Sequence, residues 1–385
     1  MNIAIFTNNY LPNPYGVSKS VESFRKELEK RGHSVFIFAP LWKEFDDKNP
    51  NVFRYPSIDT EFRFRFPLAV PHSIEMDKII KKLNLDIIHS QHPNLLGFSA
   101  SRWAKKKKIP LVFTWHTLYD QYAAFVPFLP KKLVMEYMTR KAVSYANKAD
   151  RVVVPTDSII PILKGWGVRK EMKPIATGVD EEQFRNPDRK KIRQKYNIAD
   201  DEAVLLLVSR LTPEKNVEFV FNSVFPVLKK NNRTRFLVAG DGYLADSLKD
   251  LCRKNGVEGR VIFAGLVGEN DMKDYYAASD IFVYGSKSET QGMIITEAMY
   301  SGLPIVAVSA TGVSSLVEDG ANGFLVKENE EEFSKAVLKL AEDDLLRQRF
   351  SDASARIARE EYTASVSTGK LLEMYEQAIK AHDIG

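Results

Sequence analysis

Two glutamates in the last third of the chain have a spacing that suits the recognition of a hydroxyl-rich, anionic ligand. Glu289 and Glu297 lie eight positions apart, and between them are Gly292 and the apolar residues Met293 and Ile294. Carboxylates accept hydrogen bonds from sugar hydroxyls, and the unpaired backbone N–H groups of a helix that starts near Gly292 suit a phosphate. The pattern favours a nucleotide sugar, although two glutamates at this spacing on a surface helix also occur by chance.

The elements around this pair determine where the two carboxylates lie. An apolar run at 281–284 predicts a strand, and residues 292–300 predict a helix that Ser-Gly-Leu-Pro at 301–304 ends. Glu289 is then in the loop before the helix, and Glu297 is about one and a half turns inside it. The strand, loop, helix and stop signal together make the pair more specific than its spacing alone.

Two basic residues follow another predicted strand, at 203–209, and precede a helix. Arg210 offers a planar fork and Lys215 a compact charge, so both can bind one diphosphate. Two solvated basic side chains are the alternative. Their position between a buried strand and a helix start favours the phosphate role.

Three further residues lie where a strand meets a loop. Gly240, in Gly-Asp-Gly after the strand 235–239, and Gly16, before the first helix, would let the backbone approach a phosphate closely, although tight turns use glycine as well. His116 follows the strand 111–115, at the end where open α/β sheets bind ligands. A buried structural histidine is the alternative for His116.

Alternation of short β-rich runs with amphipathic helices continues through both halves of the chain and implies two doubly wound α/β domains. The predicted strands cover 3–7, 34–39, 86–89, 111–115 and 151–154 in the first half, and 203–209, 235–239, 261–264, 280–283 and 305–308 in the second. A segment rich in glycine and proline, 174–187, marks the boundary.

Composition narrows the class of protein. The chain has 385 residues, enough for two cores, and its single cysteine, Cys252, excludes intrachain disulfides. No charge-free apolar run approaches the length of a spanning helix, and residues 1–10 resemble a first strand more than a signal peptide. We therefore expect a cytosolic protein.

Charge is divided unevenly between the two halves. Residues 1–180 carry 28 Lys and Arg against 17 Asp and Glu, a net charge of +11, and the rest carry 27 against 33. A basic first half indicates an anionic partner for that half, and both nucleic acid and an anionic membrane satisfy this condition.

The segment 285–304 closely resembles the E-x7-E region of retaining glycosyltransferases of the GT-B fold, in particular the fourth family, and the resemblance extends over nearly the whole chain. It implies two Rossmann-like domains that face a central cleft. Residues 1–178 would form the acceptor and membrane side, with the last helix, 365–385, crossing back onto it, and residues 179–364 would bind the nucleotide sugar. Where the family commonly has two adjacent glycines, this chain has Tyr15-Gly16.

The resemblance also implies roles for the site residues. Glu297 would bind the ribose hydroxyls and Glu289 the donor sugar, near which His116 would lie. The remaining donor-binding residues would be Gly16, Arg210, Lys215, Gly240, Gly292, Met293 and Ile294. The sequence contains no Asp-x-Asp, and we expect no metal, because Arg210, Lys215 and a helix dipole can neutralise the leaving diphosphate. The family favours front-face attack with retention at the anomeric carbon.

The run His-Thr-x-Tyr-Asp-x-Tyr at 116–122 resembles the diacylglycerol glucosyltransferases of this family. This resemblance implies transfer of glucose from UDP-glucose to diacylglycerol by a protein peripheral to the inner face of the cell membrane. Basic residues among apolar neighbours are the candidate membrane contacts, because such surfaces bind anionic interfaces. They are Arg63 and Arg65 in the run 62–66, and Lys131, Lys132, Arg140 and Lys141 on a helix at 131–148.

Other functions could account for parts of the same sequence pattern. A GDP-mannose-dependent phosphoinositide mannosyltransferase, or a transferase to a soluble sugar, would keep the mechanism and change the substrates. A nucleic-acid-binding protein would use the basic half, but the sequence has no recognition-helix, zinc or RNA-binding signature. A dinucleotide-dependent dehydrogenase is disfavoured, because no strand is followed by G-x-G-x-x-G.

Overall fold

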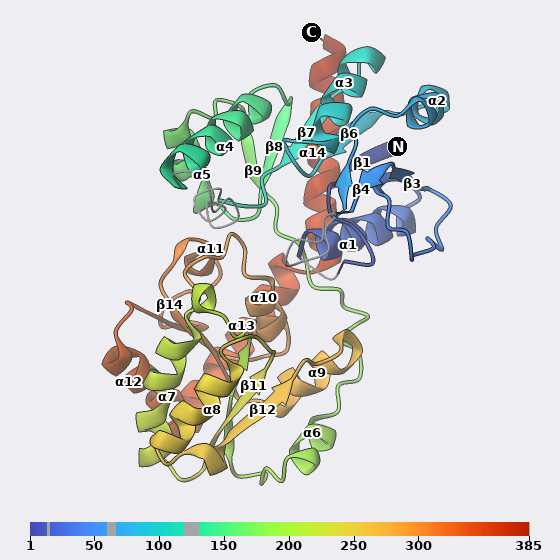
Figure 1. Cartoon of the computed structure of the whole chain (residues 1–385). Helices are drawn as coiled ribbons and strands as arrows, with labels where there is room; N and C mark the ends of the chain where they lie inside the picture. The colour runs from blue at the N-terminus through green and yellow to red at the C-terminus, as the bar shows by residue number, and fades with distance from the viewer. Residues whose placement is uncertain (14–15, 60–66, 119–130, 385) are drawn as a thin grey trace. The chain divides into compact units, whose positions relative to one another are not determined.

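Runs of β-branched and aromatic residues form two parallel sheets, each with helices packed on both faces (Figure 1). The structure is a computed structural model that describes residues 1–13, 16–59, 67–118 and 131–384. It divides into two units, residues 1–178 with 364–385 and residues 179–363, referred to below as unit 1 and unit 2. The predicted α/β fold with two doubly wound sheets is confirmed.

Unit 1 is built on a seven-stranded sheet in the order β3-β2-β1-β6-β7-β8-β9, in which every pair is parallel. Its strands are β1 (Asn2–Phe6), β2 (Ser34–Pro40), β3 (Val52–Tyr55), β6 (Ile87–Ser90), β7 (Leu111–Thr114), β8 (Arg151–Val154) and β9 (Met172–Pro174). A separate antiparallel hairpin pairs β4 (Ser57–Ile58) with β5 (Leu68–Ala69). The order reverses beside β1, so ligand-binding loops are expected at the carboxyl ends of the neighbouring strands.

Helices cover both faces of this sheet. One face packs against α2 (Ile74–Lys82), α3 (Leu96–Lys107), α4 (Lys131–Ala146) and α5 (Ile159–Trp166). The other packs against α1 (Gly16–Lys30) and α14 (Ala364–Ile384), the last helix of the chain. The amphipathic pattern of α14 buries Leu371, Met374, Tyr375 and Ala378 in this core.

Unit 2 repeats the plan with a six-stranded parallel sheet in the order β12-β11-β10-β13-β14-β15. Its strands are β10 (Ala203–Val208), β11 (Thr234–Ala239), β12 (Val261–Gly265), β13 (Ile281–Tyr284), β14 (Ile305–Val308) and β15 (Gly323–Val326). The helices are α6 (Arg189–Lys195), η2 (Pro213–Lys215), α7 (Val217–Lys230), α8 (Ala245–Lys254), η3 (Glu258–Arg260), α9 (Glu269–Ala278), α10 (Met293–Tyr300), α11 (Thr311–Ser314), α12 (Glu330–Glu342) and α13 (Asp344–Glu361).

The predicted strands all appear, but three of the four outermost strands of the two sheets were not predicted. β3, β9 and β15 lie at sheet edges, where one side of the strand has no neighbour among the described residues. Their burial patterns are mostly intermediate, so the sequence carries only a weak signal of them. The helix expected at 131–148 ends at Ala146.

Among the described residues, no helix combines the length and the apolar character needed to cross a bilayer.

Candidate functional site

Loops at the carboxyl ends of β10 and β13 bring Lys215 and Glu289 together, although 74 positions separate them. Lys215 ends the short η2 helix after β10, and Glu289 lies in the loop between β13 and α10. The Lys215 Nζ is 2.5 Å from Glu289 Oε1, and both side chains are only 17% exposed. Because β10 and β13 are parallel neighbours in the sheet, their following loops meet at one edge.

Two hydroxyl groups complete the surroundings of Glu289. Tyr284 at the end of β13 donates to Oε1 at 2.6 Å, and Ser286 donates to the same atom at 3.2 Å. Burial alone would raise the pKa of Glu289, but the charge of Lys215 and these hydrogen bonds hold the pKa below its usual value. Glu289 is therefore an ionised, largely buried acceptor of hydrogen bonds at neutral pH.

Glu297 lies on α10, where the sequence places it. Tyr276 of α9 donates a hydrogen bond to Glu297 Oε2 at 2.8 Å and orients the carboxylate. Burial and the adjacent Glu297 raise the pKa of Tyr276 well above its usual value, so the phenol stays a donor. Each glutamate of the pair is thus held by a buried tyrosine, a contact that the sequence analysis did not predict.

The start of α10 has the backbone geometry of a ligand-binding turn. Gly292 precedes the helix with φ of +78°, a left-handed conformation that glycine adopts without the usual steric cost. Met293 and Ile294 are the first residues of α10, and the first amides of a helix have no intrahelical carbonyl partner. The backbone here can donate to an anionic or hydroxylated ligand between the two glutamates.

Gly240 holds two loops of the same edge close together. Its φ is +143°, its N–H donates to the Gly265 carbonyl at 2.8 Å, and an added Cβ would overlap the Ser209 carbonyl oxygen. The loop after β11 therefore packs on the loop after β10, which carries Arg210. The Arg210 side chain is 57% exposed, and its guanidinium lies 3.3 Å from the Glu214 carboxylate, so Arg210 is accessible to a ligand.

All the predicted donor-site residues of unit 2 therefore lie in loops or in the first two turns of a helix at the carboxyl edge of one sheet. Two cations, two carboxylates and a helix N-terminus together suit a ligand that carries both phosphates and hydroxyls.

His116 lies just after β7 at the carboxyl edge of the sheet of unit 1, with its Nε2 2.6 Å from Gln91 Oε1. Because an amide oxygen only accepts, the Nε2 carries the hydrogen. Burial lowers the pKa of His116 to about 4, so the imidazole is neutral at physiological pH. His92 lies beside it with 6.3 Å between ring centres. Gly16, exposed at the start of α1, is the other predicted residue of this unit.

The predicted membrane residues fall into two groups. Arg63, Arg65 and residues 119–122 of the tyrosine-containing run lie outside the described residues, as does the side chain of Lys131. On α4, Lys132, Arg140 and Lys141 are exposed. Arg140 pairs with Glu136, and the Lys141 ammonium lies over the ring of Tyr137, which is also exposed.

Comparison with known proteins identifies the two units separately and the chain as a whole. Residues 14–183 match the model of Glycosyltransferase Family 4, and residues 188–356 match that of Glycosyl transferases group 1. Alpha-monoglucosyldiacylglycerol synthase of Streptococcus pneumoniae is 31% identical over 94% of this chain and 83% of its own length. The protein of the same name from Acholeplasma laidlawii is 28% identical over 86% of both chains.

The chain belongs to glycosyltransferase family 4.

This glycosyltransferase has the GT-B fold and depends on a nucleotide sugar. Its structure superimposes on that of Anabaena HepE, solved in complex with UDP, with a TM-score of 0.77 and 22% sequence identity. The match covers 98% of this chain and all of HepE, so both units share the fold of that protein.

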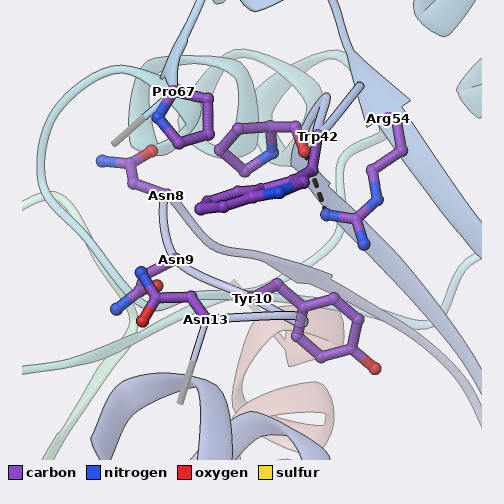
Figure 2. Close-up of a pocket in the computed structure, with 8 residues that line it drawn as sticks. Asn8, Asn9, Tyr10, Asn13, Trp42, Arg54 and Pro67 are labelled. Carbon is purple, nitrogen blue, oxygen red and sulfur yellow. Dashed lines mark hydrogen bonds between the residues drawn. The ribbon is translucent and has the colours of Figure 1, made fainter. Parts of the chain in front are cut away.

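Unit 1 of the glycosyltransferase has a pocket whose lining residues the sequence analysis did not select. It opens where β1 and β2 end, and Figure 2 shows the Trp42 indole between Asn8 and Pro67 on one side and Asn9 and Asn13 on the other. Arg54 closes one side and donates to the carbonyls of Pro40 and Leu11 at 2.9 and 2.8 Å. The three asparagines in the turn after the first strand could have indicated this pocket in the sequence. The sequence analysis selected only Gly16 of this turn.

Proposed function

We propose that the protein is a retaining hexosyltransferase that moves glucose from UDP-glucose to diacylglycerol at the inner face of the cell membrane. The observation that carries this proposal is similarity over most of the chain to two proteins named alpha-monoglucosyldiacylglycerol synthase. The donor part is supported further by the paired cations and carboxylates at the edge of the sheet of unit 2.

The donor site binds the nucleotide sugar through both hydrogen bonds and charge. Glu289 accepts hydrogen bonds from hydroxyls of the donor sugar, and Glu297 accepts those of the ribose. Lys215 has three N–H donors, so it can bind the diphosphate while it still contacts Glu289. Together with Arg210 and the start of α10, it stabilises the charge that develops as the diphosphate leaves. In this proposal the transfer requires no metal ion.

Retention of configuration follows from attack on the face that the leaving group vacates. The acceptor hydroxyl oxygen forms a bond to the anomeric carbon while the bond from that carbon to the UDP oxygen breaks. The hydroxyl proton moves to the departing phosphate, so UDP accepts both the electron pair and the proton. We assign His116 to a hydroxyl of the donor sugar, to which its neutral imidazole can hydrogen-bond.

A diacylglycerol acceptor lies in a bilayer, so the enzyme must work at the membrane surface. The outer side of α4 exposes Leu133 and Tyr137, four positions apart, next to Lys132, Arg140 and Lys141. Residues four apart lie on one helix face, and a face that mixes apolar and basic side chains suits an anionic interface. This pattern supports α4 as one membrane contact.

Mass spectrometry of lipid products tests the proposal. The enzyme would be incubated with diacylglycerol in detergent micelles and, in separate reactions, with UDP-glucose, UDP-galactose and GDP-mannose. We expect a monohexosyl diacylglycerol with UDP-glucose. A product with GDP-mannose instead would favour the mannosyltransferase alternative. Slow donor hydrolysis without any glycolipid would contradict the diacylglycerol assignment and direct the search to soluble acceptors.

A further inference from the structure

Each glutamate of the donor site accepts a hydrogen bond from a tyrosine that has almost no contact with solvent. Tyr276 of α9 is fully buried, and Tyr284 at the end of β13 is 1% exposed. Tyr276 donates to Glu297 Oε2 at 2.8 Å, and Tyr284 donates to Glu289 Oε1 at 2.6 Å. The two carboxylates therefore have a matching pair of buried phenol donors.

A row of packed aromatic rings holds both tyrosines in place. Tyr276 lies against Phe282 with 6.2 Å between ring centres, and Phe282 stacks on Tyr284 at 5.9 Å with 26° between the ring planes. Phe184 also contacts Tyr276, at 5.9 Å. Because packed core side chains rest in rotamer minima, each phenol oxygen is fixed at a definite place.

Burial also fixes the chemical state of the two phenols. Burial and the adjacent carboxylate raise the pKa of Tyr276 and of Tyr284 well above the usual value. A protonated phenol has one O–H to donate, and an ionised carboxylate only accepts. Each tyrosine therefore acts as a permanent donor that holds one oxygen of its glutamate.

The hydrogen bonds to Glu289 all fall on the same oxygen. Oε1 accepts from Lys215 at 2.5 Å, from Tyr284 at 2.6 Å and from Ser286 at 3.2 Å. Oε2 accepts from none of the residues that the structure describes. A carboxylate oxygen without a protein donor keeps its lone pairs for a ligand. Glu289 is thus oriented through Oε1 and offers Oε2 to an incoming hydroxyl group.

The two glutamates belong to different parts of the site. Glu289 lies in the loop before α10, whereas Glu297 lies in the second turn of that helix. In the roles proposed above, Glu297 binds the ribose and Glu289 binds the donor sugar. A tyrosine that orients only one of these carboxylates should affect only the matching part of the donor.

We propose that Tyr276 and Tyr284 are positioning residues with separate tasks. Tyr276 sets the affinity for the nucleotide by orienting Glu297, and Tyr284 sets the recognition of the donor sugar by orienting Glu289. A role in core packing alone would need the two rings but not their hydroxyl groups. The inference rests on the proposed function in the assignment of the two glutamates to ribose and sugar.

Titration calorimetry with UDP and with UDP-glucose, in the absence of an acceptor, tests the two tasks. Tyr276→Phe should weaken the binding of both ligands by about tenfold, a typical effect of losing a hydrogen bond to a charged group. Tyr284→Phe should leave the Kd for UDP unchanged and weaken UDP-glucose binding by about tenfold. Ser286→Ala should act like Tyr284→Phe but less strongly, because its hydrogen bond is longer.

A double variant tests whether Tyr284 acts through Glu289. Tyr284→Phe combined with Glu289→Gln should weaken UDP-glucose binding little more than Glu289→Gln alone, since residues of one network are not additive. A packing role would instead add its full effect. Tyr275→Phe is the matched control: Tyr275 is 3% exposed, and its hydroxyl contacts Tyr196 at 3.0 Å. It should change neither affinity, and a cooperative thermal melt establishes that each variant is folded.

The outcomes separate this inference from the proposed function. Equal weakening of UDP and UDP-glucose by Tyr276→Phe and Tyr284→Phe alike, no weakening by either, or additivity in the double variant would overturn the inference. A lipid product with UDP-galactose or GDP-mannose alone would instead overturn the glucose donor of the proposed function. The same comparison, made with that donor and its nucleoside diphosphate, would then decide whether the two tyrosines have separate tasks.

Discussion

Glu289 is a carboxylate that the protein keeps both largely buried and charged, and this combination requires compensation. Lys215 supplies the opposite charge at 2.5 Å, and the hydroxyls of Tyr284 and Ser286 supply hydrogen bonds to the same oxygen. A pre-formed acceptor of this kind does not have to reorganise when a sugar hydroxyl arrives. The same argument predicts that, among these residues, loss of Lys215 has the largest effect on activity.

Replacing Lys215 with alanine should lower kcat/KM for the nucleotide sugar by about a hundredfold or more, because a cation next to the leaving diphosphate is lost. Vesicle binding should be unchanged, since Lys215 is in unit 2. Steady-state kinetics with varied donor measures the effect. Lys287→Ala is the control, because Lys287 forms an exposed ion pair with Glu328 and its loss should change kcat/KM little. Equal effects of the two variants would remove Lys215 from the phosphate role.

The pKa of Glu289 predicts a pH dependence of stability. Its pKa in the folded protein is below the usual 4.5, so its charged form contributes stability above pH 4.5 that is lost as the pH falls through the folded pKa. Glu289→Gln lacks this contribution. The Tm difference between wild type and Glu289→Gln should therefore shrink as the pH is lowered from neutral toward 3, as followed by thermal melts. The exposed control Glu75→Gln should change the Tm little at neutral pH. A Glu289→Gln difference that grows at low pH would contradict the argument.

At the scale of elements, the donor site depends on how loops after neighbouring strands pack on one another. Gly240 allows the loop after β11 to contact the backbone of Ser209, and its N–H bonds the end of β12. Gly292 turns the chain into α10 between the two glutamates. These glycines have a positional role, since positive φ or a backbone contact excludes a side chain at each.

Gly240→Ala should destabilise the protein by about 1–3 kcal/mol, because a Cβ would overlap a carbonyl oxygen in a packed turn. It should also weaken UDP binding, since the adjoining loop carries Arg210. Differential scanning calorimetry and UDP titration measure the two effects. Gly259→Ala is the matched control, because an added Cβ there has no neighbour within 4 Å. A Gly240→Ala protein with the Tm and UDP affinity of the control would refute this account of the turn.

At the scale of the whole molecule, the chain builds two cores, and its last helix belongs to the first of them. Leu371, Met374, Tyr375 and Ala378 of α14 fill one face of the sheet of unit 1. The Tyr375 hydroxyl lies 2.6 Å from His89 Nδ1, and burial lowers the pKa of His89 to about 3, so this histidine stays neutral. Residues at the end of the chain thus stabilise the unit formed at its beginning.

Leu371→Ala should lower the stability of unit 1 by about 2–5 kcal/mol, because Leu371 is buried and its loss leaves a cavity. Unit 2 has its own core and should keep its stability, including its stabilisation by UDP. Calorimetry with and without UDP would distinguish the two transitions. Leu345→Ala, at an exposed leucine of α13, should leave both unchanged. A shift of only the UDP-sensitive transition in Leu371→Ala would contradict the assignment of α14 to unit 1.

The sequence by itself determined the fold class and most of the elements, because buried parallel strands and amphipathic helices leave strong periodic patterns. It also selected Glu289, Glu297, Arg210 and Lys215, since each is next to a strand end or helix start that the local pattern reveals. Edge strands such as β3 and β15 escaped prediction because their half-exposed residues follow no clear period.

Only the tertiary structure decided which of these residues touch. The contact of Lys215 with Glu289 and the Trp42 pocket join segments that are adjacent only because parallel strands align their carboxyl ends. The contact of Tyr276 with Glu297 likewise depends on how α9 and α10 pack. Local sequence patterns are set by neighbours along the chain, whereas these contacts are set by the order of strands in the sheet, which no short-range pattern encodes.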